Sequence, residues 1–297
     1  MSAALVAIYR SPRKSACDER ALVLLALGIV GLIERADDGF VLLVDAEDSA
    51  RAASQLNSYE LERALERQRA AAVPPPVILH GAAWVGCVMY AVVLLAVALM
   101  IANGIGRLDA FERGALDGAG VQAGQWWRAW TALTLHLDAA HLAANLGAGC
   151  WFGYLASRQL GSGVAWLLTL EGAAVAGLLE GLLGPPDHRA VGASTAVFTA
   201  LGLLSAYAWR MRQQLPQRWP QRWGPLVAGV VLLGWLGSAG EDTDLIGHVA
   251  GFAVGVALGV LAALPAAQRT LPRLTQWVAG AVALASLAIA WACALAP

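Results

Sequence analysis

The chain has 297 residues, of which 58% are hydrophobic and only 14% are charged, and its mean hydropathy is +0.59. Charged residues make up about 25% of an ordinary soluble domain. The composition of this chain therefore excludes a protein that is soluble throughout and predicts a polytopic membrane protein. The net charge of −1 excludes a general basic surface of the kind that attracts nucleic acid. The four cysteines have neither metal-ligand nor redox-pair spacing, so we expect no disulfide framework.

Residues 1–73 are polar enough to form a separate soluble domain. Their pattern predicts the order β-α-β-β-α, with a helix that begins near Asp18, a hairpin that turns at residues 37–39 and a second helix over 46–72. We interpret this small α+β domain as a regulatory or docking module, because it holds no nucleophile, metal cluster or phosphate-binding loop. Residues 74–77 include three consecutive prolines and predict a stiff linker.

Beyond the linker, seven segments have the length and hydropathy of membrane-spanning helices. They are approximately residues 78–102, 131–156, 163–183, 192–210, 225–240, 244–265 and 275–295. The expected fold class is therefore an all-α polytopic membrane protein preceded by a soluble α+β domain. We divide its membrane part into a six-helix core over residues 78–265 and a loop with one additional C-terminal helix over residues 266–297.

Arginines mark one side of the expected bundle. They crowd the loops after segments two, four and six, and include Arg158, Arg210, Arg212, Arg218, Arg222, Arg269 and Arg273. Since basic residues concentrate in cytoplasmic loops, this pattern predicts a cytoplasmic N-terminus and an outer C-terminus. The high alanine and arginine content, with no recognisable targeting segment, leads us to expect a bacterial inner membrane.

Ser194 lies at the start of the fourth segment, directly after the sharp turn that Gly192 permits. A hydroxyl needs a base to become a nucleophile, and His248 is the best placed of the five histidines because it also opens a glycine-rich apolar segment. Glycine recurs at every fourth residue of this segment, at Gly247, Gly251, Gly255 and Gly259. This spacing predicts close approach to a neighbouring helix. We hypothesise that Ser194 and His248 meet across two packed helices and cut peptide bonds.

Polar residues also cluster where the second segment begins. His141 and Asn145 are four residues apart and share a helix face, where two donors would hold a developing oxyanion near the serine. The simpler alternative is that they only form hydrogen bonds between helices, which is the commoner role of such residues taken alone. His136 is five residues before His141, so we expect the two rings to point apart, and the segment lacks the H-E-x-x-H spacing of a zinc pair.

Taken together, these motifs resemble the rhomboid intramembrane serine proteases. The resemblance rests on H-x4-H-x3-N from His136 to Asn145, on G-x-S ending at Ser194, and on G-H-x-x-G-x3-G around His248. Trp127-Arg128, before the second segment, is similar to the family's first-loop motif. Each motif alone is weak, but their order and placement also match, so the resemblance covers about residues 78–265.

The resemblance implies six core helices around a water-filled cavity that opens to the outer side. Ser194 would be the nucleophile and His248 the general base, in a dyad without an acid. His141, Asn145 and the backbone amide of Ser194 would form the oxyanion hole. The substrates would be transmembrane proteins within the lipid bilayer, and no cofactor, metal or nucleic acid is implied.

The resemblance gives other residues supporting roles. Phe198 matches the aromatic residue that packs on the catalytic histidine, and His136 matches a histidine that is more structural than catalytic. The segment between helices one and two would form a membrane-embedded loop, and the fifth helix, with the loop after it, would form the substrate gate. The seventh helix matches the family variant that has one helix added at the C-terminus.

One departure from the family pattern is Thr195, which stands where the family usually has glycine and adds bulk beside the nucleophile. It leaves open a catalytically inactive rhomboid-like protein that binds transmembrane clients, although the other polar positions favour an active protease. A transporter or channel is a second alternative, weakened by the lack of a clear internal repeat. Glu171 and Glu180 in the third segment demand a partner or a proton at membrane depth. Glu171 could bond serine, threonine or tryptophan groups in the bundle, or it could line the cavity, and the sequence does not choose between these.

Overall fold

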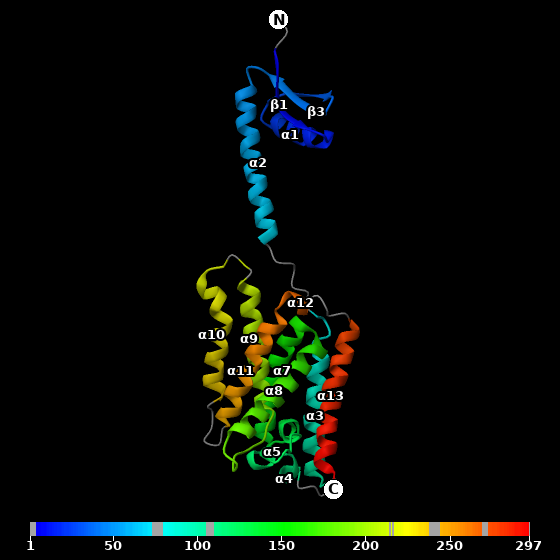
Figure 1. Ribbon diagram of the computed structural model, residues 1–297, viewed down its shortest axis with the longest axis vertical. Helices are drawn as coiled ribbons and strands as arrows, with labels where there is room; N and C mark the ends of the chain where they lie inside the picture. The colour runs from blue at the N-terminus through cyan, green and yellow to red at the C-terminus, as the bar shows by residue number, and fades with distance from the viewer. Residues whose placement is uncertain are drawn as a thin grey trace. The chain divides into compact units, whose positions relative to one another are not determined.

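In the computed structural model the chain forms two compact units, residues 1–74 and 75–297 (Figure 1). The structure describes residues 4–72, 80–104, 110–213, 215, 217–237, 244–268 and 273–296. The predicted linker over 74–77 lies outside the described residues.

The N-terminal unit has the predicted order of elements. They are β1 (Leu5–Ser11), α1 (Lys14–Ala26), β2 (Gly31–Ala36), β3 (Gly39–Asp45) and α2 (Ser49–Ala72). The sheet is antiparallel with the order β1-β3-β2, and its hairpin closes at Gly39, whose φ of +139° suits glycine. Leu24, Leu42 and Val44 are fully buried between the sheet and α1, so this unit has its own hydrophobic core.

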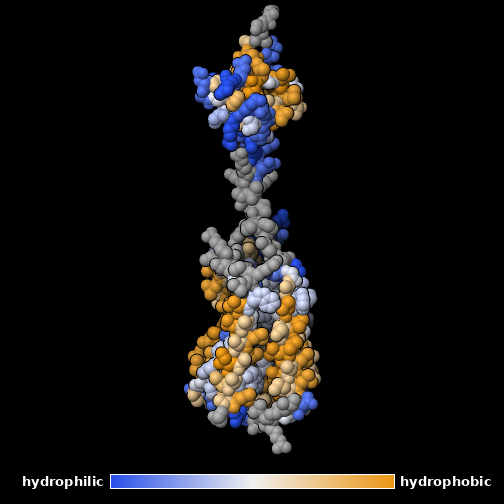
Figure 2. Space-filling view, turned by 90° about the vertical axis from the view of Figure 1, so that its right-hand side faces the viewer, coloured by the Kyte–Doolittle hydropathy of each residue, from blue (hydrophilic) through white to orange (hydrophobic). Residues whose placement is uncertain are grey.

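Each of the seven segments predicted to span the membrane contains one long helix. They are α3 (Trp84–Ala102), α7 (Ala139–Leu160), α8 (Ser162–Leu183), α9 (Ser194–Gln213), α10 (Trp219–Gly237), α11 (Leu245–Ala262) and α13 (Arg273–Leu295), with a short α12 (Pro265–Gln268) before the last. Among the described helices, α3, α8, α11 and α13 are long and apolar enough to cross a membrane. The face that carries α3 and α13 is largely apolar (Figure 2), as expected for a surface in contact with lipid.

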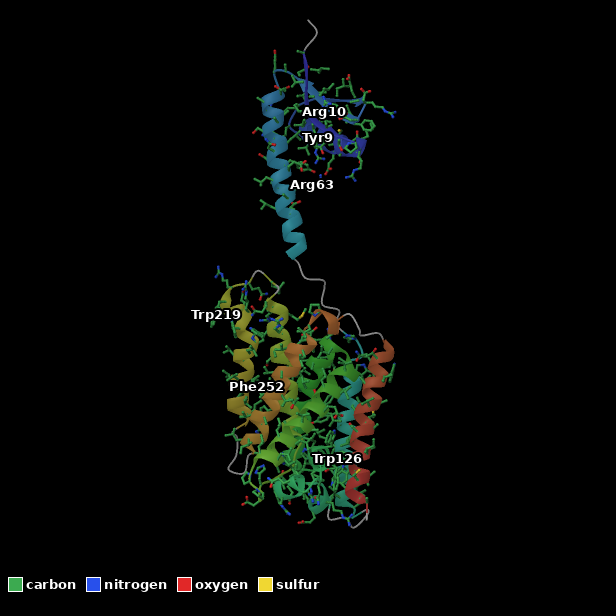
Figure 3. All side chains as sticks on the ribbon, in the orientation of Figure 1. Tyr9, Arg10, Arg63, Trp126, Trp219 and Phe252 are labelled. Atoms are coloured by element: carbon green, nitrogen blue, oxygen red, sulfur yellow. The ribbon has the colours of Figure 1, made fainter. Side chains whose placement is uncertain are left out.

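The start of the second segment differs from the prediction. The helix begins at Ala139 rather than near residue 131, because the Asp138 carboxylate accepts a 2.7 Å hydrogen bond from the His141 amide and caps the helix there. Residues 110–134 instead form a compact first loop (Figure 3, near Trp126). Its elements are α4 (Ala110–Gly114), β4 (Leu116–Asp117), α5 (Gly118–Gln122), α6 (Arg128–Thr131) and the 3-10 turn η1 (Ala132–Thr134).

Helix α9 lies at the centre of the bundle and packs most closely against α11. A methyl group placed on Gly251 would lie 2.6 Å from the carbonyl oxygen of Thr195, and one placed on Gly255 would overlap the carbonyl oxygen of Thr199. The predicted glycine stripe therefore does bring two backbones into contact. Gly247, the first glycine of the predicted period, lies instead against Glu180 of α8.

Candidate active site

Ser194 is the first residue of α9, and the chain enters this helix through Gly192, which has a φ of +129°. The carbonyl oxygen of Ala193 accepts the first helical hydrogen bond, from the amide of Val197 at 2.9 Å. The amide of Ser194 is thus one of the N-terminal N–H groups that have no acceptor within their own helix. A free N–H at the positive end of a helix favours negative charge beside the serine.

A pocket lies beside Ser194. Its wall includes Gly192 and Thr195 next to the serine, Leu133 from η1, Gly177 from α8, and Asp244 before α11. The short strand β5 (Arg189–Ala190) pairs with β4 of the first loop, with Leu116 opposite Ala190. This pairing ties the first loop to the segment that leads into α9, so the loop forms part of the same pocket wall.

His248 lies in the first turns of α11 and is only 5% exposed. Its Nδ1 atom is 3.0 Å from the carbonyl oxygen of Gly237. A carbonyl oxygen can only accept a hydrogen bond, so Nδ1 carries the proton and Nε2 keeps a lone pair. The ring of Phe198, one turn along α9 from Ser194, packs on the imidazole with ring centroids 4.5 Å apart.

The crossing of α9 and α11 brings the two predicted catalytic positions toward each other. Thr195 follows Ser194 directly and touches Gly251, which is three residues after His248. Among the residues that the structure describes, no hydrogen bond joins the Ser194 hydroxyl to the His248 ring. The catalytic contact between them therefore stays a prediction.

His141 and Asn145 converge on Gly192. A methyl group placed on Gly192 would lie 2.7 Å from Nε2 of His141 and 3.6 Å from Nδ2 of Asn145. Asn145 is 5% exposed, and its buried Nδ2 has no hydrogen-bond partner within the described part of the chain. A buried donor that is left unpaired costs free energy unless a ligand or a reaction intermediate uses it.

The expectation that His136 and His141 point apart is wrong. Their rings meet edge to face, with centroids 5.1 Å apart, because His136 precedes α7 and does not follow its helical rotation. The Nε2 atom of His136 accepts a 3.4 Å hydrogen bond from the amide of Ala193. His136 thus supports the backbone that enters α9.

Trp127 and Arg128 lie in the first loop and order its backbone. The Arg128 guanidinium donates to the carbonyl oxygen of Ala115 at 2.8 Å and to the side chain of Gln125 at 2.5 Å. The Trp127 carbonyl accepts from the Thr131 hydroxyl at 3.2 Å. Neither side chain lines the pocket beside Ser194, so both act on the shape of the loop.

The sequence did not reveal that Glu180, His188 and Asp244 lie together beside this pocket. Asp244 caps α11, since its carboxylate accepts a 2.9 Å hydrogen bond from the Gly247 amide. The sequence requires a partner or a proton for Glu180, and the structure places Nε2 of His188 2.8 Å from its Oε1 atom. The three come from separate segments with no regular spacing, so no sequence signal joins them.

Residues 123–264 match the family model of the Rhomboid domain. The chain is also 31% identical over 154 residues to the "Rhomboid protease GluP" of Bacillus subtilis (strain 168). That match covers 52% of this chain and 29% of the relative, so the chain spans less than a third of the relative's length. The matched segment contains Ser194, His248, His141 and Asn145, and together with the apolar helices it shows that this integral membrane protein contains a domain of the rhomboid family.

Proposed function

We propose that the chain is a serine endopeptidase that cleaves transmembrane proteins inside the membrane, with Ser194 as nucleophile and His248 as general base. The observation that carries this proposal is the crossing of α9 and α11 at Thr195 and Gly251, adjacent to both residues. The hydrogen bond from Nδ1 of His248 to Gly237 supports it, because the other ring nitrogen is then the proton acceptor.

The chemistry follows from these groups. Nε2 of His248 takes the proton of the Ser194 hydroxyl as the oxygen attacks the scissile carbonyl carbon, and the imidazolium then protonates the leaving amine. A water molecule, deprotonated by the same nitrogen, hydrolyses the acyl-enzyme and restores the serine. The dyad needs no acidic residue as a third member, because the Gly237 carbonyl already fixes the tautomer and orientation of the His248 ring.

The oxyanion of the tetrahedral intermediate would be held by the Ser194 amide and by the side chains of His141 and Asn145. All three lie around Gly192, and the Asn145 amide group is buried with a free donor. In oxyanion holes of this kind, loss of one donor raises the activation free energy by about 2.7–4 kcal/mol.

The departure at Thr195 is accommodated by packing. The Cγ2 atom of Thr195 and its carbonyl oxygen lie against Gly251, so α11 takes up much of the added bulk. The Thr195 carbonyl also accepts a 2.8 Å hydrogen bond from the Thr199 hydroxyl. These contacts favour an active protease over an inactive rhomboid-like protein.

The proposal also covers how substrates reach the active site and how the chain is oriented in the membrane. Helix α10 would be the substrate gate, because Gly229 and Gly237 are its buried residues while Val230 and Trp235 are exposed. Substrates would be single-span or polytopic proteins, cut near the outer leaflet. The chain would lie in a bacterial inner membrane with its N-terminus in the cytoplasm, as the arginine pattern predicts.

The test uses the purified full chain in detergent with a single-span reporter and a serine-reactive covalent probe. We expect cleavage and labelling by the wild type, and loss of both in Ser194→Ala and in His248→Ala. Ser205→Ala removes another buried hydroxyl of α9 and His80→Ala another histidine, so both variants should keep cleavage and labelling. Equal cleavage by Ser194→Ala and the wild type would remove the serine from the mechanism.

Two other outcomes identify the alternatives. A folded wild-type chain that binds transmembrane segments but neither cleaves nor reacts with the probe would be an inactive rhomboid-like protein. Solute flux through liposomes that contain the chain, without proteolysis, would indicate a transporter or channel.

A further inference from the structure

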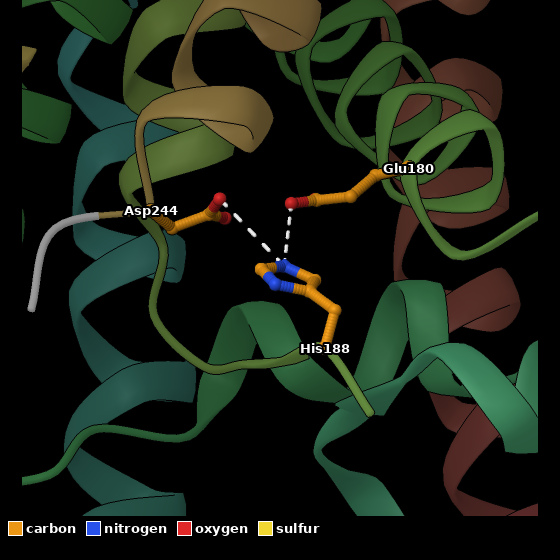
Figure 4. Close-up of side chains that lie close together, drawn as sticks. All are labelled: Glu180, His188 and Asp244. Carbon is orange, nitrogen blue, oxygen red and sulfur yellow. Dashed lines mark hydrogen bonds and ion pairs between the residues drawn. The ribbon is translucent and has the colours of Figure 1, made fainter. Parts of the chain in front are cut away.

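Three side chains that can each bind a metal ion come from separate segments and converge beside the Ser194 pocket (Figure 4). Glu180 lies near the C-terminal end of α8, His188 in the connection to β5, and Asp244 immediately before α11. Nε2 of His188 is 2.8 Å from Oε1 of Glu180 and 3.8 Å from Oδ1 of Asp244. The ligand atoms of all three lie within 4.8 Å of one another.

The two carboxylates of this cluster lie close together, and that of Glu180 is buried. Glu180 is 4% exposed, and its Oε2 atom is buried with no hydrogen-bond partner in the described part of the chain. A methyl group placed on Gly247 would overlap Oδ2 of Asp244 and lie 2.8 Å from Oε2 of Glu180, so both oxygens face this glycine. A buried carboxylate beside a second carboxylate needs a proton, a protonated imidazole or a metal cation to balance the negative charge.

The donor set decides which cation fits. One imidazole nitrogen with two carboxylate oxygens suits Zn²⁺, whereas Mg²⁺ and Ca²⁺ prefer all-oxygen sites. Ligand atoms at about 2.0–2.1 Å from a tetrahedral Zn²⁺ are about 3.3 Å apart. The observed 2.8 Å and 3.8 Å separations bracket this value, so small side-chain movements would complete the geometry.

We propose that Glu180, His188 and Asp244 form a Zn²⁺ site that clamps the end of α8, the connection to β5 and the start of α11. Three protein ligands leave a fourth position for water. Asp244 lies one helical turn before His248 and, with Glu180, also lines the pocket of Ser194. Bound Zn²⁺ would therefore hold the start of α11 in place, and this proposal does not depend on the proposed protease activity.

The test measures Zn²⁺ binding to the purified full chain in detergent by equilibrium dialysis, and thermal unfolding with and without Zn²⁺. We expect one Zn²⁺ per wild-type chain and a higher unfolding temperature when it is bound. Glu180→Gln and His188→Ala should each weaken Zn²⁺ binding at least about ten-fold and abolish the shift in unfolding temperature. His80→Ala and Asp187→Asn, a histidine elsewhere and an exposed acid in the same loop, are matched controls that should bind as the wild type does.

Several results would overturn the proposal. They are the absence of stoichiometric binding to the wild type, equal binding by His188→Ala, and Mg²⁺ binding as tight as Zn²⁺ binding. The first result would mean that a proton within the cluster, on His188 or between the carboxylates, balances the charge instead. His188 is partly exposed and lies outside the helices, so this variant decides the question even if Glu180→Gln folds poorly.

Discussion

The hydroxyl of Ser286 on α13 donates a 2.6 Å hydrogen bond to Oε1 of Glu171 on α8, and Oε2 of the same carboxylate accepts from Nε1 of Trp130 at 3.2 Å. Glu171 thus has the serine and tryptophan partners that the sequence left as one of its alternatives. The bond joins the additional C-terminal helix to the rhomboid core. Trp291 of α13 adds a second link, since its Nε1 donates to the Thr134 hydroxyl at 3.2 Å.

A double-mutant cycle of Glu171→Gln and Ser286→Ala tests this link. Each single change should lower the free energy of unfolding in detergent by about 1 kcal/mol, because a partly buried polar group loses a hydrogen-bond partner. The two effects should be coupled by at least about 0.5 kcal/mol. Ser157→Ala is the control, since its buried hydroxyl has no described partner to lose. Strictly additive single effects would show that the bond does not contribute to stability.

Gly192→Ala should abolish or strongly reduce proteolysis while leaving the bundle folded. The φ of +129° is strained for alanine, and the new methyl group would displace the His141 ring, whose Nε2 would be only 2.7 Å away. The strain costs about 1–3 kcal/mol, a modest part of the stability of the bundle. Reporter cleavage and thermal unfolding are measured together. Gly147→Ala is the matched control, because a methyl group there meets nothing within 4 Å; similar activity in both variants would contradict the role of Gly192.

Gly255→Ala should instead act on stability. The new methyl group would overlap the carbonyl oxygen of Thr199, so α9 and α11 must separate, at a cost of at least about 1–3 kcal/mol. Gly251→Ala should behave similarly and also reduce cleavage, since it separates the helices next to Ser194 and His248. The unfolding temperature in detergent checks both variants against Gly147→Ala. An unchanged unfolding temperature in Gly255→Ala would mean that the two helices do not depend on close backbone contact.

The sequence predicts much of the fold because its signals are local. The seven long helices follow from runs of apolar residues, and the N-terminal hairpin follows from the turn at Gly39. The glycine period predicts the α9–α11 contact, since small side chains at one helix face leave room for another backbone. The placement of Phe198 on His248 follows the family resemblance and is seen in the structure.

The sequence is less informative where the chain departs from regular helix. The capping bond at Asp138 starts α7 late, so His136 leaves the helix and meets His141 against expectation. Glu180, His188 and Asp244 come from three separate segments that meet only in the folded bundle, so their spacing along the chain does not predict that they lie together. Helical periodicity describes one element at a time, whereas this cluster is a property of the whole bundle.

The last prediction concerns acid stability of the N-terminal unit. The hydroxyl of Tyr59 donates a 2.6 Å hydrogen bond to Glu19, and this bond, with the nearby Arg63 and Arg20, lowers the pKa of the Glu19 carboxyl below its ordinary value. A lowered folded-state pKa stabilises the fold above the unfolded-state pKa of about 4.3, and this stabilisation is lost as the pH falls through the folded-state pKa. Protection of α1 and α2 against hydrogen exchange, corrected for intrinsic rates, should therefore fall below about pH 4.3.

Glu19→Gln removes this titration, so protection of the same helices should be lower at neutral pH and change less on acidification. Glu47→Gln, which alters an exposed carboxyl of the same unit that has no described hydrogen bond, should follow the wild type at every pH. An identical acid response in Glu19→Gln and the wild type would assign the loss of protection to other carboxyls, and the Tyr59 bond would then be a surface contact without influence on folding.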